Sequence, residues 1–106
     1  MEIAELIEKR GLSTIVNKRC ASACTFAFAG GKERIVAGNG VLGFHASRGP
    51  SVLLEWLKDT NLEDAFRKQR GLDDQFIARA NAVPCNAIWY PTHDELMAAG
   101  VVTAIR

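Results

Sequence analysis

A serine and a histidine stand at a spacing that could bring a nucleophile and a general base together. Ser22 lies in segment 20–25, between small residues that leave the nearby backbone N–H groups unobstructed, and His45 ends the short apolar segment 42–45. An imidazole that accepts the hydroxyl proton makes serine a nucleophile, and the N–H group of the next residue, Ala23, can stabilise the resulting oxyanion. In the alternative interpretation, Ser22 is only a small residue that lets a helix pack closely on a sheet, and His45 is a core or surface residue bonded to backbone.

Three cysteines leave several kinds of chemistry open. Cys20 and Cys24 have no second pair of ligands at zinc-site spacing, so we expect no metal site. The cysteines are then small buried hydrophobic residues, a disulfide or a catalytic thiol. His93 lies where a helix is expected to begin, and the sequence offers no second residue that would pair with it in a catalytic site.

The composition is that of one globular domain over residues 1–106. Hydrophobic residues make up 48% of the chain and charged residues 24%. Thirteen basic against twelve acidic residues give a net charge of +1, which excludes a nucleic-acid partner held by charge. No apolar run is long enough for a membrane span, and the acidic amphipathic N-terminus is no export signal.

The residue pattern predicts alternating helices and strands. Helices are expected over 1–10, 21–29, 52–70, 73–81 and 92–100, and strands over 13–16, 34–37, 41–44 and 101–105. Residues 38–40 are expected to form the turn between two neighbouring strands. Thr92 and Glu95 have the spacing of a capping box. The chain is therefore predicted to be a single α/β unit.

These segments together resemble the superfamily of Clp protease proteolytic subunits and crotonases. Within it they are similar to a set of uncharacterised bacterial proteins predicted to be periplasmic. That set carries Cys-x-Ser-Ala-Cys-Thr, matched at 20–25, an arginine-bearing strand, matched around Arg34, and Leu-Gly-Phe-His, matched at 42–45. A tail like residues 89–103 follows. The resemblance implies an α/β spiral, shortened at its N-terminus.

The resemblance also implies roles for individual residues. Ser22 would be the nucleophile at a helix N-terminus, Ala23 an oxyanion donor and His45, 23 residues later, the general base. Peptidase members supply an acid before the closing helix, but residues 79–90 contain no Asp or Glu. Asn81 or Asn86 is left to orient the imidazole, and we assign this role to Asn86.

The implied function is that of a serine hydrolase of the peptidase type, acting on a peptide or acyl substrate without metal or cofactor. We expect weak or lost activity, because the acid and a glycine-bearing strand before the first helix are absent. The alternative is a noncatalytic assembly or binding module on the same fold. Relatives form homo-oligomers, and a homo-oligomer is expected here.

Relatives also begin with an export signal. A longer gene product would therefore be periplasmic, and there Cys20 or Cys24 would pair with Cys85.

Overall fold

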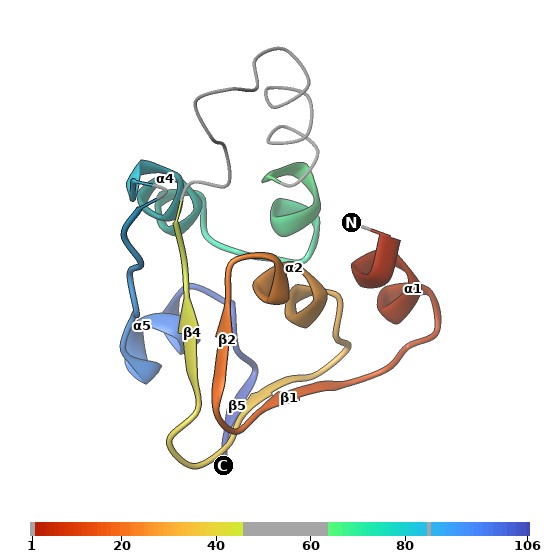
Figure 1. Ribbon diagram of the computed structural model, residues 1–106. Coiled ribbons are helices and arrows are strands. Elements are labelled where there is room, and N and C mark those ends of the chain that lie inside the picture. Colours follow the sequence, from red (N-terminus) through yellow and green to blue (C-terminus); the bar gives the residue numbers. More distant parts are fainter. Residues whose placement is uncertain (1, 46–63, 85) are drawn as a thin grey trace.

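Helices are interspersed with short parallel strands along the chain (Figure 1). The computed structural model describes residues 2–45, 64–84 and 86–106. The helices are α1 (Glu2–Lys9), α2 (Ala23–Ala29), α4 (Asp74–Ala82) and α5 (His93–Ala98), and residues 64–69 are also helical. The strands are β1 (Thr14–Val16), β2 (Arg19–Ala21), β3 (Arg34–Val36), β4 (Val41–Gly43) and β5 (Ala104–Ile105). The predicted α/β class is confirmed.

The strands form two small parallel sheets. The first has the order β1-β3-β5, and the second pairs β2 with β4. The expected turn over 38–40 therefore does not join paired strands, since β3 and β4 belong to different sheets. Each of them instead pairs with a strand that precedes α2, because parallel pairing needs a crossover connection between the two strands.

Two strands differ most from the prediction, while the other described elements lie within about two residues of their predicted bounds. β2 was not predicted, and Ala21 was assigned to the following helix, which begins at Ala23 instead. The last strand is shorter than the predicted 101–105, because the N–H groups of Val101 and Val102 still bond to the Leu96 carbonyl of α5. Of the predicted helix over 52–70, residues 52–63 lie outside the described part.

Both predicted helix starts near the C-terminus have side-chain caps. Asp73 accepts the N–H of Phe76 at the start of α4, at 3.0 Å. Thr92 and Glu95 form the predicted capping box at the start of α5. Each cap satisfies backbone donors that have no partner inside the helix.

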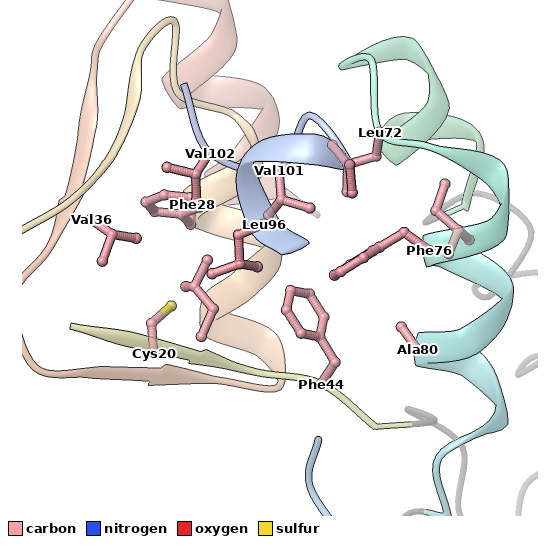
Figure 2. Packing of buried hydrophobic residues seen from close by; sticks show 13 residues of the cluster. Cys20, Phe28, Val36, Phe44, Leu72, Phe76, Ala80, Leu96, Val101 and Val102 are labelled. Atoms are coloured by element: carbon pink, nitrogen blue, oxygen red, sulfur yellow. The ribbon is translucent and has the colours of Figure 1, made fainter. Parts of the chain in front are cut away.

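The main core lies between the β2–β4 sheet and helices α2, α4 and α5 (Figure 2). Its largest fully buried side chains are Leu42, Leu96, Val36 and Cys20. At one end of this core, Phe44 packs edge-on against Phe76 at 5.1 Å between ring centroids, and Trp89 packs on Phe76 at 5.0 Å. These aromatic side chains fix Phe44, the residue that directly follows β4.

A buried arginine joins the first sheet to the loops around it. The Arg34 guanidinium donates to the carbonyl oxygens of Val101 at 2.9 Å, Gly100 at 2.9 Å and Gly31 at 3.1 Å. Burial, together with the nearby Arg70, lowers the pKa of Arg34 from its ordinary value. Arg34 therefore holds backbone, and it is not displayed to a ligand.

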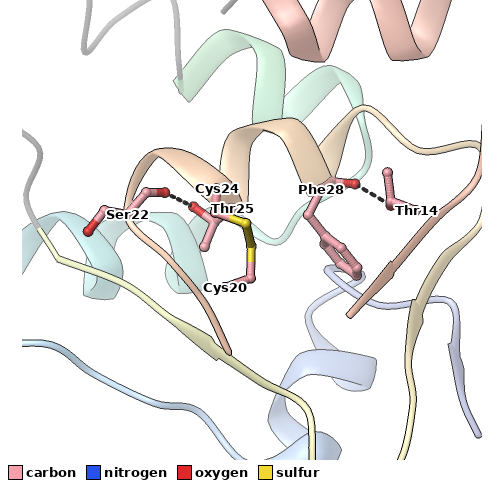
Figure 3. Close-up of a disulfide and its surroundings, with 6 residues drawn as sticks. All are labelled: Thr14, Cys20, Ser22, Cys24, Thr25 and Phe28. Atoms are coloured by element: carbon pink, nitrogen blue, oxygen red, sulfur yellow. Dashed lines mark hydrogen bonds between the residues drawn. A yellow bond between two sulfur atoms is a disulfide. The ribbon is translucent and has the colours of Figure 1, made fainter. Parts of the chain in front are cut away.

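The glycine pair after α2 lets neighbouring elements approach this helix. A side chain at Gly30 would collide with the backbone of Ala4 in α1, and one at Gly31 would collide with Thr14 in β1. Thr14 Oγ1 also donates to the Phe28 carbonyl at 2.8 Å (Figure 3). Close packing on both sides therefore fixes the end of α2. Among the described residues, no helix is long and apolar enough to cross a membrane.

Candidate active site

Ser22 occupies the sharp turn that leads from β2 into α2. Its backbone has φ 58° and ψ −121°, and it is the one non-glycine residue with positive φ in the described ranges. Its N–H donates to the Gly43 carbonyl at 3.1 Å, and its own carbonyl accepts the Thr25 hydroxyl at 2.6 Å (Figure 3). An L-residue in this conformation is strained by about 1–3 kcal/mol, so surrounding contacts must hold it there.

His45 follows β4 at the same end of the small sheet. The parallel register sets Ala21 opposite Gly43, so Ser22 and His45 both leave the sheet just beyond that pair. Phe44 fixes the exit of the strand, because its N–H and carbonyl both bond to Trp89, at 2.9 and 2.8 Å.

The two side chains meet. Ser22 Oγ lies 2.5 Å from His45 Nε2. When Nε2 carries no proton, the hydroxyl donates to it, which is the arrangement that a general base needs in order to take the serine proton. The structure thus brings together the two residues that the sequence singled out.

The N–H of Ala23 follows Ser22 directly along the backbone. Ala23 is the first residue of α2, so its N–H has no carbonyl partner inside the helix. Among the described residues it has no other backbone acceptor. The role of this N–H as an oxyanion donor stays a prediction.

The two asparagines proposed to orient the imidazole lie in different surroundings. Asn81 donates its amide to both carboxylate oxygens of Asp64, at 3.1 and 2.9 Å, and is engaged there. Asn86 is exposed, and within the described ranges no hydrogen bond joins it to His45. The orienting role of Asn86 stays a prediction.

Cys20 and Cys24 form a disulfide (Figure 3). The expected pairing of either residue with Cys85 is wrong, because the turn at Ser22 brings the two Cα atoms to 5.3 Å, within the usual range for a disulfide. Both sulfurs are bonded, so neither serves as a catalytic thiol. Of the alternatives left open for these two cysteines, the structure contains the disulfide.

Sequence reasoning missed two residues that support the site. The Thr25 hydroxyl and N–H both bind the Ser22 carbonyl. At Gly43 a Cβ atom would lie 2.7 Å from Ile88 Cγ2 and 2.8 Å from Tyr90 Cε1, so this position favours glycine. The local sequence signals were a threonine three residues after the serine and a glycine two residues before the histidine.

The remaining histidine has a structural partner. His93 Nε2 bonds to the Gly40 carbonyl at 2.9 Å. In the described part of the chain, no group of three or more His, Cys, Asp or Glu side chains is placed to hold a metal ion.

No family model and no curated protein matches this sequence. A solved structure of a ClpP1 point mutant from Listeria monocytogenes is similar to it, with a TM-score of 0.55 and 17% sequence identity. The alignment covers 98% of this chain and 63% of the ClpP1 chain. An identity this low carries the fold and not the activity. The chain therefore has a Clp-protease-like α/β fold over a span equal to about two thirds of that neighbour.

Proposed function

We propose that this protein is a serine hydrolase of the peptidase type, with Ser22 as nucleophile and His45 as general base. The observation that carries the proposal is the contact between Ser22 Oγ and His45 Nε2 at 2.5 Å. The positive φ of Ser22 supports it, because strained backbone conformations cluster at functional sites. The Clp-protease-like fold is consistent with this function.

The proposed reaction is a two-step acyl transfer. Ser22 Oγ attacks the acyl carbon while His45 Nε2 takes the hydroxyl proton, and the Ala23 N–H donates to the oxyanion. The intermediate then expels the leaving group, which receives the proton from His45. A water molecule, deprotonated by His45, hydrolyses the acyl ester and regenerates Ser22. The substrate is a peptide or another acyl compound.

We expect this activity to be weak. A carboxylate that orients the imidazole and stabilises its protonated form raises turnover about 10,000-fold. An amide can orient the imidazole but does not stabilise its positive charge. Residues 79–90 supply only the amides of Asn81 and Asn86. Asn81 is bonded to Asp64, and we propose Asn86 as the orienting group.

The test is covalent labelling with a fluorophosphonate, followed by mass spectrometry of the peptides. We expect an adduct on Ser22 that disappears in Ser22→Ala. Ser13→Ala is the matched control, since Ser13 is an exposed serine before β1 and plays no part in the proposal. An unlabelled Ser22 in the folded wild-type chain would contradict the proposed function.

A second candidate is a noncatalytic assembly module, favoured by exposed apolar side chains in and between α1 and β1. These side chains are Ile3, Leu6, Leu12 and Ile15, with Ile15 exposed by 63%. β1 is also an edge strand, and exposed apolar edges pair with other chains. We propose that the protein forms homo-oligomers through these side chains and the edge of β1. Light scattering should find a wild-type oligomer that Ile15→Lys disrupts, and a wild-type monomer at every concentration would contradict the proposal.

A further inference from the structure

The disulfide brackets the proposed nucleophile. Cys20 is the central residue of β2 and Cys24 lies in the first turn of α2, so the bond closes a small ring with Ser22 at its centre. Figure 3 shows the disulfide to one side of the turn that carries Ser22. The reaction proposed above uses neither sulfur atom.

The two ends of the ring are fixed to the elements that carry the site. Cys20 is 2% exposed in the core and lies opposite Leu42 on β4, the strand that leads to His45. Cys24 belongs to α2, whose first residue, Ala23, supplies the proposed oxyanion donor. The disulfide thus links the β2–β4 sheet, which leads to His45, to helix α2, which begins at Ala23.

This turn is also where the backbone is strained. Ser22 has φ 58°, a conformation that L-residues rarely keep without outside constraint. Hydrogen bonds to Gly43 and from Thr25 hold part of the turn. The disulfide adds a covalent constraint that limits how far the backbone at Ser22 can relax.

We infer that the Cys20–Cys24 disulfide is a positioning element for Ser22, and that the reactivity of the hydroxyl toward acyl compounds depends on the redox state of this pair. The inference rests on the proposed function. The oxidised chain is the reactive form. In the reduced chain the turn relaxes, Ser22 Oγ leaves His45 Nε2, and the nucleophile loses its base.

The bond is suited to reversible reduction by a dithiol. Cys24 is exposed, and a hollow of about 180 Å³ reaches both sulfur-bearing residues between β1 and α2. A dithiol thiolate attacks the Cys24 sulfur and expels Cys20 as a thiolate, which is then protonated. The second dithiol sulfur closes its own disulfide and releases Cys24, so the protein gains two electrons and two protons.

The short ring argues for a local effect. A disulfide stabilises a fold mainly by restricting the unfolded chain, and it does so least when few residues lie between the cysteines. Here the sequence separation is four. The fold should therefore survive reduction while the geometry at Ser22 changes.

The experiment compares Ser22 labelling by a fluorophosphonate in the oxidised chain and in the chain reduced with dithiothreitol. A Cys85→Ser background removes the third thiol. Peptide mass spectrometry gives the rate at Ser22, and far-UV circular dichroism follows the fold in the same samples. We expect labelling to slow about tenfold on reduction, the scale set by one strained backbone conformation, and to recover on re-oxidation. The Cys24→Ser variant should label as slowly as the reduced chain, and dithiothreitol should not change its rate.

Each other outcome has a distinct meaning. Equal rates in both redox states of a folded chain would overturn the inference and leave the proposed function standing. Loss of the circular dichroism signal on reduction would also overturn it, because the bond would then be a general staple of the fold. No Ser22 labelling in either state would overturn the proposed function, and the inference with it.

Discussion

Replacing Ser22 with glycine should give a more stable protein than replacing it with alanine. Both variants lose the hydroxyl and its bond to His45, so that loss cancels in the comparison. What differs is the Cβ atom at φ 58°. Alanine keeps a strained conformation that glycine adopts without a steric penalty.

The magnitude follows from two opposing contributions. Strain of about 1–3 kcal/mol is relieved in Ser22→Gly and retained in Ser22→Ala. Against this, glycine lowers the free energy of unfolding by about 0.4–1 kcal/mol, because it gives the unfolded chain more conformational freedom than alanine does. The free energy of unfolding of Ser22→Gly should therefore exceed that of Ser22→Ala by about 1 kcal/mol.

The assay is urea denaturation of both variants under oxidising conditions. Ala78→Gly is the matched control, because Ala78 is exposed in the middle of α4 and should lose about 1 kcal/mol on replacement. Replacing alanine with glycine should thus raise the free energy of unfolding at position 22 and lower it at position 78. If glycine destabilises position 22 as it does position 78, Ser22 does not hold a strained turn and the reasoning fails.

Three further predictions concern the elements that support the site. Removing the buried guanidinium in Arg34→Met should cost about 3 kcal/mol in urea denaturation, because several carbonyl oxygens lose their donor, and a loss under 1 kcal/mol would contradict its structural role. Thr92→Ala should lower the free energy of unfolding by about 1 kcal/mol, because the capping box is lost, and amide hydrogen exchange in α5 should become faster. Thr103→Ala is the control, because Thr103 is exposed and bonds to Arg34, so hydrogen exchange in α5 should not change. The pKa of Glu95 is lowered, chiefly because its carboxylate accepts the Thr92 N–H. The stability that ionised Glu95 contributes is therefore present above its ordinary pKa of 4.5 and is lost as the pH falls through the lowered pKa. Thermal unfolding should show a smaller acid destabilisation in Glu95→Gln than in wild type, and equal pH profiles of the two proteins would contradict the assignment.

The parts of the fold that were predictable have strong local signals. Thr92 and Glu95 have the spacing of a capping box, and both expected bonds form. The apolar spacing in residues 73–81 gave a helix within one residue of α4. Such signals need only neighbours in the sequence, which is why they can be read without knowing the rest of the fold.

The parts that were missed depend on distant contacts. β2 is three residues long, and it is a strand because Cys20 pairs with Leu42 on β4 and is buried there. A run of Arg, Cys and Ala has little strand propensity of its own. The neighbouring strands over 34–44 suggested a hairpin for the same reason, since local spacing does not tell a turn within one sheet from a crossover between two.

The candidate site was predictable in its two side chains but not in its geometry. A serine between small residues and a histidine at a strand end suggested the pair, and they lie 2.5 Å apart. The disulfide partner was not predictable, because three cysteines allow three pairings. The positive φ of Ser22 has no sequence signal, since glycine is the residue that usually marks it.

The most direct test of the central claim, that His45 activates Ser22, is the rate at which a fluorophosphonate labels Ser22 in His45→Gln and in His93→Gln. His93 is the matched control, because it bonds to the Gly40 carbonyl and not to Ser22. Removing a general base should slow the reaction about 100-fold or more in His45→Gln, while His93→Gln should label at close to the wild-type rate. Equal labelling of Ser22 in the two folded variants would contradict the claim.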